Sequence, residues 1–467
     1  MEFNSVVFLF CFLPLCLLIY YLTPAKAKNA VLLLESLLFY AWGSAEFLPL
    51  ILILVIVNYI GGLLMQRLIL GARGRRVVLA VSVALTLGAL IFFKYTNFLI
   101  GTINGIANLQ IASLSFLNIL PLGISYYTFK LISYSADVAS GKIDAEHNLI
   151  DFAAYAVMFP QLKVGPIVKY RDISQALHAP KSRCTAQRAQ DGAEMFVFGL
   201  AKKVILADSI GMLWSDVIDP VSGIGLANAS TPLIWLGILA YSLQLYFDFA
   251  GYSEMSNGLS LMFGFECPAN FNLPYVSKSA TEFWRRWHIT LSLWFRDYVY
   301  IPLGGNRHGL ARQIFNMAVV WALTGIWHGA NWNFICWGLY YFAVLTLEKA
   351  FLLKHLNKGR IWPHLYTLLV VIVGWGIFTA NAPGVGVGPL MRGLFLPQGG
   401  VSVLYYLRNY GVLLIACALC SSTLPSKIWA WAKQHMPVRI TLFAAAFISS
   451  VAFVVASTSS TALYANF

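Results

Sequence analysis

Apolar residues run along the chain in about twelve segments, most of them about 20 residues long. A run of that length crosses the hydrocarbon core of a bilayer, roughly 30 Å thick, as one α-helix. The pattern therefore predicts an all-α polytopic membrane protein with about 11–12 transmembrane helices. A short run, 29–43, and the stretch around 150–160 also predict interfacial or re-entrant helices. The segments lie near residues 3–22, 29–43, 47–66, 77–97, 112–134, 191–213, 232–252, 313–329, 331–348, 362–380, 401–421 and 440–457.

The composition agrees with this pattern and excludes a soluble protein. Charged residues make up 11% of the chain and hydrophobic residues 59%. An ordinary soluble domain carries roughly 25% charged residues, because its surface must be polar. Internal repeats of the kind found in many transporters are not evident by eye. We therefore expect a single integral-membrane domain that spans residues 1–467.

The net charge of +13 describes topology rather than nucleic-acid binding, so no nucleic-acid partner is expected. Lysine and arginine collect on the cytoplasmic side of membrane proteins. If the six basic stretches lie inside, twelve crossings place both termini outside. These stretches are 26–28, 66–76, 163–188, 278–312, 349–360 and 427–439.

The first apolar run resembles a signal peptide only in part. Residues 25–27, Ala-Lys-Ala, look like a cleavage site, but the first five residues contain one acid and no base. The basic residues follow the run instead, which is typical of an uncleaved span with its N-terminus outside. The seven cysteines show no metal-ligand or disulfide-framework spacing, so we expect no metal site.

Chemistry is expected in the central third, residues 120–345. Here glycine, proline, asparagine and charged residues interrupt the apolar pattern, and polar groups inside a membrane are costly and usually functional. Two of the eight histidines stand out. His328 lies between Trp327 and Gly329 at the end of an apolar segment, where it either acts in catalysis or caps a helix.

His288 is the second candidate, and neutral histidine is a natural general base near pH 7. It lies in a basic, aromatic stretch that ends at Pro302 and Gly304-Gly305. Helical spacing predicts one amphipathic helix there, which is either an interfacial anchor or part of a catalytic site. Its aromatic stripe is Trp284, Trp287, Leu291, Trp294 and Tyr298.

Two further polar groups lie in this third of the chain. Gln244, Asp248 and Tyr252 are spaced by four and so share a helix face. The carboxylate needs a cation, which we expect from residues 278–296, either as a structural pair or beside a catalytic cavity. The loop 159–171 carries two prolines and three cations, and it either holds phosphates or simply marks the cytoplasmic side.

These motifs together resemble the membrane-bound O-acyltransferase (MBOAT) family, and specifically its bacterial alginate O-acetyltransferase-like branch. The resemblance runs from the first span to about residue 380, with five motifs in the family order. They are Pro121–Phe129, Phe159–Ile167, Gln244–Ser253, Phe283–Arg307 and Ile326–Gly329, and Phe39–Trp42 also fits.

The resemblance implies a ring of helices around a central channel and an enzyme of the bacterial inner membrane. It implies that His328 is the essential catalytic residue and that His288 is a second polar position near the reaction centre. No cofactor stays bound, and acetyl-CoA enters from the cytoplasm as the acyl donor. The channel lining is expected to include Gln244, Asp248, Tyr252, Trp327 and Asn331.

The chemistry that follows is attack of a hydroxyl on a thioester, with His328 as general base. His288 or a neighbouring polar group orients the acyl carbonyl and stabilises the oxyanion. The phosphates of coenzyme A require cations on the inner face. The expected cations are Lys163, Lys169, Arg171, Arg285, Arg286, Arg296 and Arg307.

We thus expect acetyl transfer across the membrane to an extracytoplasmic polysaccharide, completed by a separate extracytoplasmic acetyltransferase. D-alanyl transfer to teichoic acid, by a related branch, is the alternative, and a transporter of lipid-linked sugars is the alternative of another class. Lys130 replaces an uncharged polar residue of the branch. Thr379 and Ala380 stand where alginate enzymes tend to carry Phe-Phe-Arg-Ala, which weakens alginate as the specific acceptor.

Overall fold

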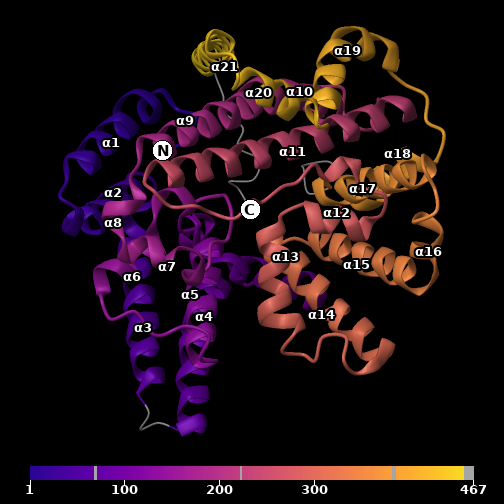
Figure 1. Ribbon diagram of the computed structural model, residues 1–467. Helices are drawn as coiled ribbons and strands as arrows, with labels where there is room; N and C mark the ends of the chain where they lie inside the picture. Colours follow the sequence, from indigo (N-terminus) through magenta and orange to yellow (C-terminus); the bar gives the residue numbers. More distant parts are fainter. Residues whose placement is uncertain (68–70, 221–222, 381–384, 457–467) are drawn as a thin grey trace. The chain divides into compact units, whose positions relative to one another are not determined.

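The computed structural model describes residues 1–67, 71–220, 223–380 and 385–456 (Figure 1). Its described residues form helices joined by loops, with no β-structure except an isolated bridge between Ala229 and Val401. Within the described ranges, seven helices are long and apolar enough to cross a membrane, and one of them, Ala25–Gln66, is long enough to contain two crossings. The prediction of an all-α polytopic membrane protein is confirmed.

The chain packs as two compact units. The first contains Met1–Phe196 and Ser253–Ala269, and the second contains Val197–Tyr252 and Asn270–Phe467. Whether they act as one functional domain stays a prediction. The helices from the N-terminus to the middle of the chain are α1 (Leu13–Leu22), α2 (Lys28–Ser44), α3 (Leu48–Gln66), α4 (Gly71–Ala107), α5 (Ile124–Ala139), α6 (Leu149–Val157), α7 (Tyr170–His178), α8 (Pro180–Arg183) and α9 (Ala186–Ala201).

The remaining helices belong mostly to the second unit. They are α10 (Asp208–Ile218), α11 (Thr231–Met262), α12 (Ala280–Arg286), α13 (Ile289–Phe295), α14 (Gly309–His328), α15 (Trp332–Leu347), α16 (Leu353–Leu356), α17 (Trp362–Thr379), α18 (Val387–Phe395), α19 (Val403–Cys420), α20 (Leu424–Ala432) and α21 (Met436–Ala456). Short π-helical turns occur at Phe8–Phe12, Lys202–Ala207, Arg296–Tyr300 and Glu348–Leu352, and 3₁₀ turns at Ala25–Ala27, Ala45–Phe47, Ser115–Asn118, Phe159–Gln161 and Pro274–Val276.

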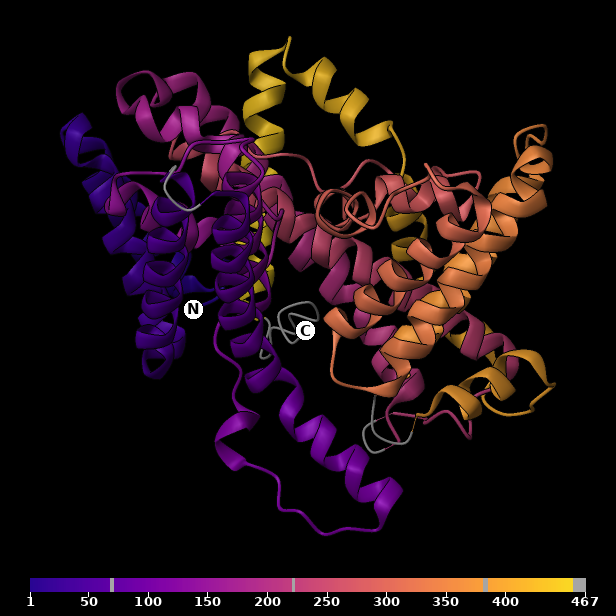
Figure 2. The same cartoon turned by 90° about the horizontal axis from the view of Figure 1, so that it is seen from below.

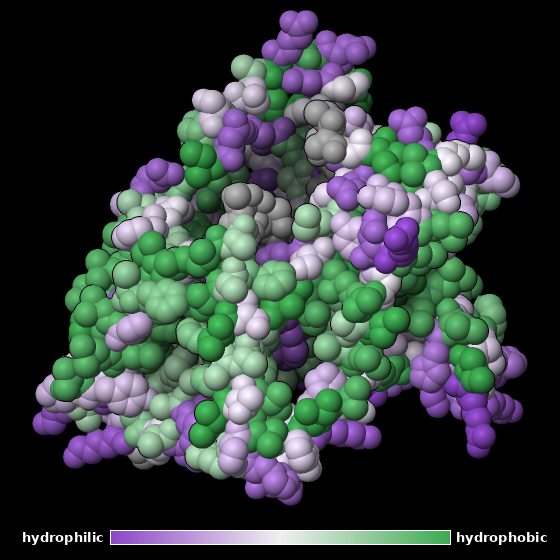
Figure 3. Space-filling view, turned by 90° about the horizontal axis from the view of Figure 1, so that it is seen from above, coloured by the Kyte–Doolittle hydropathy of each residue, from purple (hydrophilic) through white to green (hydrophobic). Residues whose placement is uncertain are grey.

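Large apolar side chains remain exposed on many of these helices, as expected for surfaces that face lipid. Only 6% of the apolar window of α21 and 11% of that of α19 is buried. Figure 3 shows apolar residues over most of the face that it draws, with hydrophilic residues gathered toward its edges. Surfaces of this kind are stable in a bilayer and unstable in water.

The first unit is held by helix pairs that meet through buried polar contacts. The helices α3 and α4 lie side by side (Figures 1 and 2). Between them, the Asn58 side-chain amide donates to the Thr86 hydroxyl at 2.8 Å, and the Ser135 hydroxyl of α5 donates to the Asn58 carbonyl oxygen at 2.8 Å. Because every polar atom here finds a partner within a short distance, the contact specifies one register of the helices.

The predicted segment 112–134 is only partly a helix. The helix α5 begins at Ile124, and Gly123 before it adopts a left-handed conformation with φ +68°. A Cβ at Gly123 would lie 2.0 Å from the carbonyl oxygen of Leu162, so the buried loop that contains Leu162 packs directly onto this backbone. The apolar residues before Gly123 form loop rather than membrane span, which hydropathy alone does not distinguish.

Candidate active site

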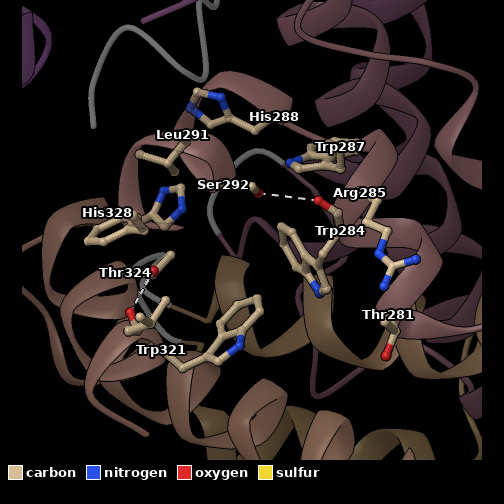
Figure 4. Close-up of a pocket in the computed structure, with 12 residues that line it drawn as sticks. Thr281, Trp284, Arg285, Trp287, His288, Leu291, Ser292, Trp321, Thr324 and His328 are labelled. Carbon is tan, nitrogen blue, oxygen red and sulfur yellow. Dashed lines mark hydrogen bonds between the residues drawn. The ribbon is translucent and has the colours of Figure 1, made fainter. Parts of the chain in front are cut away.

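The second unit contains a cavity of about 240 Å³ that is formed by α12, α13 and α14 (Figure 4). His288 and His328 both line it, although they are 40 positions apart in the sequence. In the close-up, Leu291 lies between the two imidazole rings. Trp284, Trp321, Thr324 and Arg285 also line the cavity. The structure therefore brings together the two histidines that the sequence analysis selected.

His328 is the last residue of α14 and is 3% exposed. Aromatic rings surround it, with centroid distances of 5.0 Å to Trp327, 5.0 Å to Trp337 and 5.3 Å to Phe378. Since α15 and α17 supply two of these rings, three helices fix the position of this imidazole. A ring held in this way loses little conformational entropy when a substrate binds.

The position of His328 depends on a close crossing of α14 and α15 at two glycines. A Cβ added to Gly325 would lie 2.5 Å from the Phe334 carbonyl oxygen, and one added to Gly338 would lie 2.5 Å from the Trp321 carbonyl oxygen. Small residues let helix backbones approach in this way inside membranes. The same crossing places Trp321 and His328 in the cavity wall.

His288 lies at a break between α12 and α13. Its backbone is left-handed, with φ +43° and ψ +54°, a conformation that is uncommon for any residue except glycine. Asn270 holds this turn: its carbonyl oxygen accepts from the Ile289 backbone N–H at 3.0 Å, and its side-chain Oδ1 lies 3.0 Å from His288 Nδ1. Strained backbone that is braced in this way is typical of functional sites.

The environment of His288 is dry and aromatic. Its imidazole is 1% exposed and meets the Phe249 ring edge-on at a centroid distance of 4.7 Å. The Trp327 ring lies 6.0 Å away. Burial disfavours the charged form and lowers the pKa of His288 to about 3. His288 is therefore neutral at physiological pH.

The prediction of one continuous amphipathic helix across residues 284–298 is wrong. Residues Trp287 and His288 interrupt it, and a π-helical turn at Arg296–Tyr300 follows α13. Aromatic periodicity does not reveal the break, because the hydrogen bonds that stabilise it come from Asn270 and Asn272 in another segment. The break turns His288 into the protein interior.

Arg285 is the one of the predicted donor-binding cations that lines this cavity. Arg286 is instead engaged by Glu282 at 2.8 Å and by the Asn272 carbonyl oxygen at 3.1 Å. Arg296 pairs with Asp297 at 2.8 Å, and Arg307 is exposed in the turn before α14. Arg286 and Arg296 thus have local partners that account for their placement.

The other three predicted cations, Lys163, Lys169 and Arg171, belong to the first unit, whereas the cavity belongs to the second. Lys163 forms an ion pair with Glu2, and Arg171 lies 3.8 Å from Asp137. Lys169 is 5% exposed and is the N-cap residue of α7. A role for these residues in binding phosphates stays a prediction.

Asp248 pairs with a cation that differs from the one predicted. Its carboxylate lies 2.7 Å from Lys203 Nζ, which also contacts Asp208 at 2.6 Å, and no partner from residues 278–296 is needed. Lys203 belongs to a π-helical turn, Lys202–Ala207. Such a turn adds a residue to the helical repeat and changes the face on which the next side chains lie.

The predicted channel residues otherwise take several places. Gln244 and Tyr252 are buried in α11, and Gln244 packs over Gly211, where a Cβ would lie 2.2 Å from its side chain. The Trp327 ring contacts both imidazoles, at centroid distances of 6.0 Å to His288 and 5.0 Å to His328. Asn331 caps α15 by accepting from the Asn333 backbone N–H. Their role in lining a channel stays a prediction.

Sequence analysis missed several residues that form the site. Asn270 was not selected, although it is a polar residue in a stretch, residues 268–274, that begins and ends with proline. Trp321 and Thr324 looked like ordinary residues of an apolar segment. Thr324 lies one helical turn and Trp321 two helical turns before His328, so helical spacing from that histidine could have found them.

Glu146, Asp151 and His178 also lie together in the first unit, with potential ligand atoms within 4.8 Å of one another. Each already has a hydrogen-bond partner. Tyr170 donates to Glu146, which also lies 2.8 Å from His178 Nε2, and Asn29 donates to Asp151 at 2.6 Å. This network explains the cluster as a polar contact between helices.

Comparison with known proteins assigns the chain to a family. The sequence pattern of the MBOAT, membrane-bound O-acyltransferase family matches residues 124–382, a range that includes both cavity histidines. The chain belongs to this family. It is therefore a multi-pass membrane enzyme of the O-acyltransferase type, and the predicted family and enzyme class are confirmed.

Three bacterial enzymes are similar to this MBOAT chain. It is 43% identical over 390 residues to a probable alginate O-acetylase of Azotobacter vinelandii, covering 82% of this chain and 75% of that protein. It is 33% identical to the peptidoglycan O-acetyltransferase of Helicobacter pylori, covering 81% and 77%. The teichoic acid D-alanyltransferase of Lacticaseibacillus rhamnosus is 31% identical over 52% of this chain and 62% of its own length. The better coverage by O-acetylating relatives favours acetyl transfer.

Proposed function

We propose that this MBOAT enzyme transfers an acetyl group from cytoplasmic acetyl-CoA, across the inner membrane, for O-acetylation of an extracytoplasmic polysaccharide. The observation that carries the proposal is the shared cavity of His288 and His328. The relatives that match the chain over about four-fifths of its length are named for O-acetylation of alginate and of peptidoglycan.

In this proposal His328 is the general base. It accepts the proton of the attacking hydroxyl while the new C–O bond forms at the thioester carbonyl carbon. The C–S bond then breaks, and the leaving thiolate takes the proton from the imidazolium. The apolar ring cage around His328 excludes water, which protects the thioester from hydrolysis.

Arg285 at the cavity supplies a cation for an anionic part of the donor, whereas Arg286 is engaged by Glu282. The distribution of basic stretches supports a cytoplasmic entry of the donor and an N-terminus outside. A separate extracytoplasmic acetyltransferase completes the transfer to the polymer.

The test is the acetyl content of the secreted polysaccharide in cells that carry single variants. His328→Ala abolishes acetylation, while the amount of the variant enzyme in the membrane stays at the wild-type level. His355→Ala is the matched control, because His355 is an exposed histidine whose Nδ1 lies 3.0 Å from the Phe351 carbonyl oxygen, four residues earlier in the chain. Normal acetylation in His328→Ala cells would rule out the proposed chemistry.

Donor labelling distinguishes the two thioester chemistries. Membranes that contain the enzyme transfer label from acetyl-CoA, and not from a D-alanyl carrier-protein thioester. Labelling by the D-alanyl donor alone would move the chain to the teichoic-acid branch. Sealed vesicles of defined orientation test the direction: only a donor on the cytoplasmic face is consumed.

A further inference from the structure

His288 has a defined tautomer, which follows from the contacts of Asn270. The Oδ1 atom of Asn270 lies 2.9 Å from Thr290 Oγ1, 3.4 Å from the Thr290 backbone nitrogen and 3.0 Å from His288 Nδ1. A backbone N–H can only donate, so the Asn270 atom that faces it must be the oxygen rather than the amide nitrogen. An oxygen of this kind can only accept.

His288 Nδ1 must therefore carry a hydrogen and donate it to Asn270 Oδ1. Burial keeps the ring neutral, and a neutral imidazole carries one N–H. The other nitrogen, Nε2, then holds a lone pair and acts as a hydrogen-bond acceptor. His288 lines the cavity and Asn270 does not, so the nitrogen of His288 that can contact a ligand in the cavity is Nε2.

We infer that Asn270 is a positioning residue that holds His288 as a hydrogen-bond acceptor, so that His288 binds a hydroxyl of the acetyl acceptor other than the attacking one, whose single proton goes to His328. This inference rests on the proposed function. A developing oxyanion requires donors, and a nitrogen lone pair repels it. The role that the sequence analysis gave His288, stabilising the acyl oxyanion, is the one that this tautomer disfavours.

The backbone supports the same assignment. The left-handed turn at His288 is braced by the Ile289 N–H donating to the Asn270 carbonyl oxygen, so one residue fixes both the backbone and the imidazole. Two other elements confine the ring, through Phe249 of α11 and Trp327 of α14. Asn270, Phe249 and Trp327 do not titrate near neutral pH, and the titratable and charged side chains that share the cavity with His288 are His328 and Arg285.

The direct test is nitrogen NMR of the full-length enzyme in lipid, labelled with ¹⁵N-histidine. The signals of His288 are assigned by their loss in His288→Gln. We expect Nδ1 to resonate as a protonated nitrogen and Nε2 as an unprotonated one. A protonated Nε2 in the wild-type enzyme would overturn the inference, and this readout does not depend on whether the chain transfers acetyl groups.

Substitution of Asn270 adds a functional test. Asn270→Leu removes the acceptor, so the opposite tautomer becomes populated and polysaccharide acetylation falls at least tenfold. Asn272→Leu is the matched control, because its exposed side chain lies two residues away in the same loop. Equal losses in the two variants would contradict a specific role of Asn270.

Asn270→Asp separates positioning from packing. A carboxylate accepts the same hydrogen bonds, so the Nδ1–H tautomer is retained, and its charge raises the pKa of His288. We expect activity near the wild-type level at alkaline pH and a new loss of activity as the pH falls, because the protonated ring no longer accepts. A purely structural role predicts that Asp is as damaging as Leu at every pH, with no new titration.

Discussion

Gly338 offers a test of how closely the α14–α15 crossing determines catalysis. In Gly338→Ala the new Cβ would lie 2.5 Å from the Trp321 carbonyl oxygen. An ordinary C···O contact is about 3.3 Å, so the two helices must separate by roughly 0.8 Å. Both atoms at the contact belong to the crossing itself, and a backbone oxygen inside a helix cannot move aside as a flexible side chain does.

Two effects follow from this displacement. Overpacking of this kind costs about 1–3 kcal/mol of stability. Trp321 and His328 lie on the displaced helix and line the cavity, and a shift near 1 Å in a catalytic group lowers rates by about 100-fold. We therefore expect acetylation to fall by roughly 10- to 100-fold, with the variant still inserted in the membrane.

The assay is polysaccharide acetylation per amount of membrane-inserted enzyme, together with thermal unfolding of the purified enzyme in detergent. Gly88→Ala is the matched control, because Gly88 lies inside α4 and a Cβ there meets nothing within 4 Å. Alanine is also the better helix former, so this control keeps its activity and stability. Equal behaviour of the two variants in both measurements would refute the packing argument.

Three further predictions follow from other contacts. Lys203→Met leaves Asp248 buried without its cation and destabilises the enzyme by about 3–5 kcal/mol. Adding Asp248→Leu restores part of that loss, because Asp208 has also lost Lys203; thermal unfolding measures both variants, and a double variant no more stable than Lys203→Met would contradict the pairing. Asn331→Ala removes the N-cap of α15 and lowers the stability of the enzyme by about 1 kcal/mol, whereas Asn331→Ser keeps the cap and the stability. Thermal unfolding of the two variants beside the wild type measures this difference. The pKa of His288 is about 3 in the folded enzyme and about 6.5 when unfolded, so unfolding takes up a proton below pH 6.5. The stability that the neutral His288 allows is complete above pH 6.5 and is lost as the pH falls toward 3. If the melting temperature depends on pH as steeply in His288→Asn as in the wild type, this reasoning is contradicted.

Much of the fold followed from local patterns. Apolar runs of about 20 residues predict membrane helices whatever their neighbours are, because unsatisfied backbone groups are too costly in lipid. The boundary of the helix in segment 112–134 depended on a distant contact: the segment is mostly apolar, but α5 begins only at Ile124, because the Leu162 backbone packs onto Gly123. Hydropathy measures whether a segment avoids water, and not whether lipid or protein covers it.

Sequence patterns and motif order were sufficient to identify a polytopic membrane O-acyltransferase and to select His288 and His328 as its candidate catalytic histidines. The break at His288, its contact with Asn270 and the pairing of Asp248 with Lys203 depend on the tertiary structure. The physical reason is the range of the interactions. Hydropathy and motif order are carried by neighbours in sequence, whereas the hydrogen bond from His288 to Asn270 and the ion pair of Asp248 join residues from separate elements.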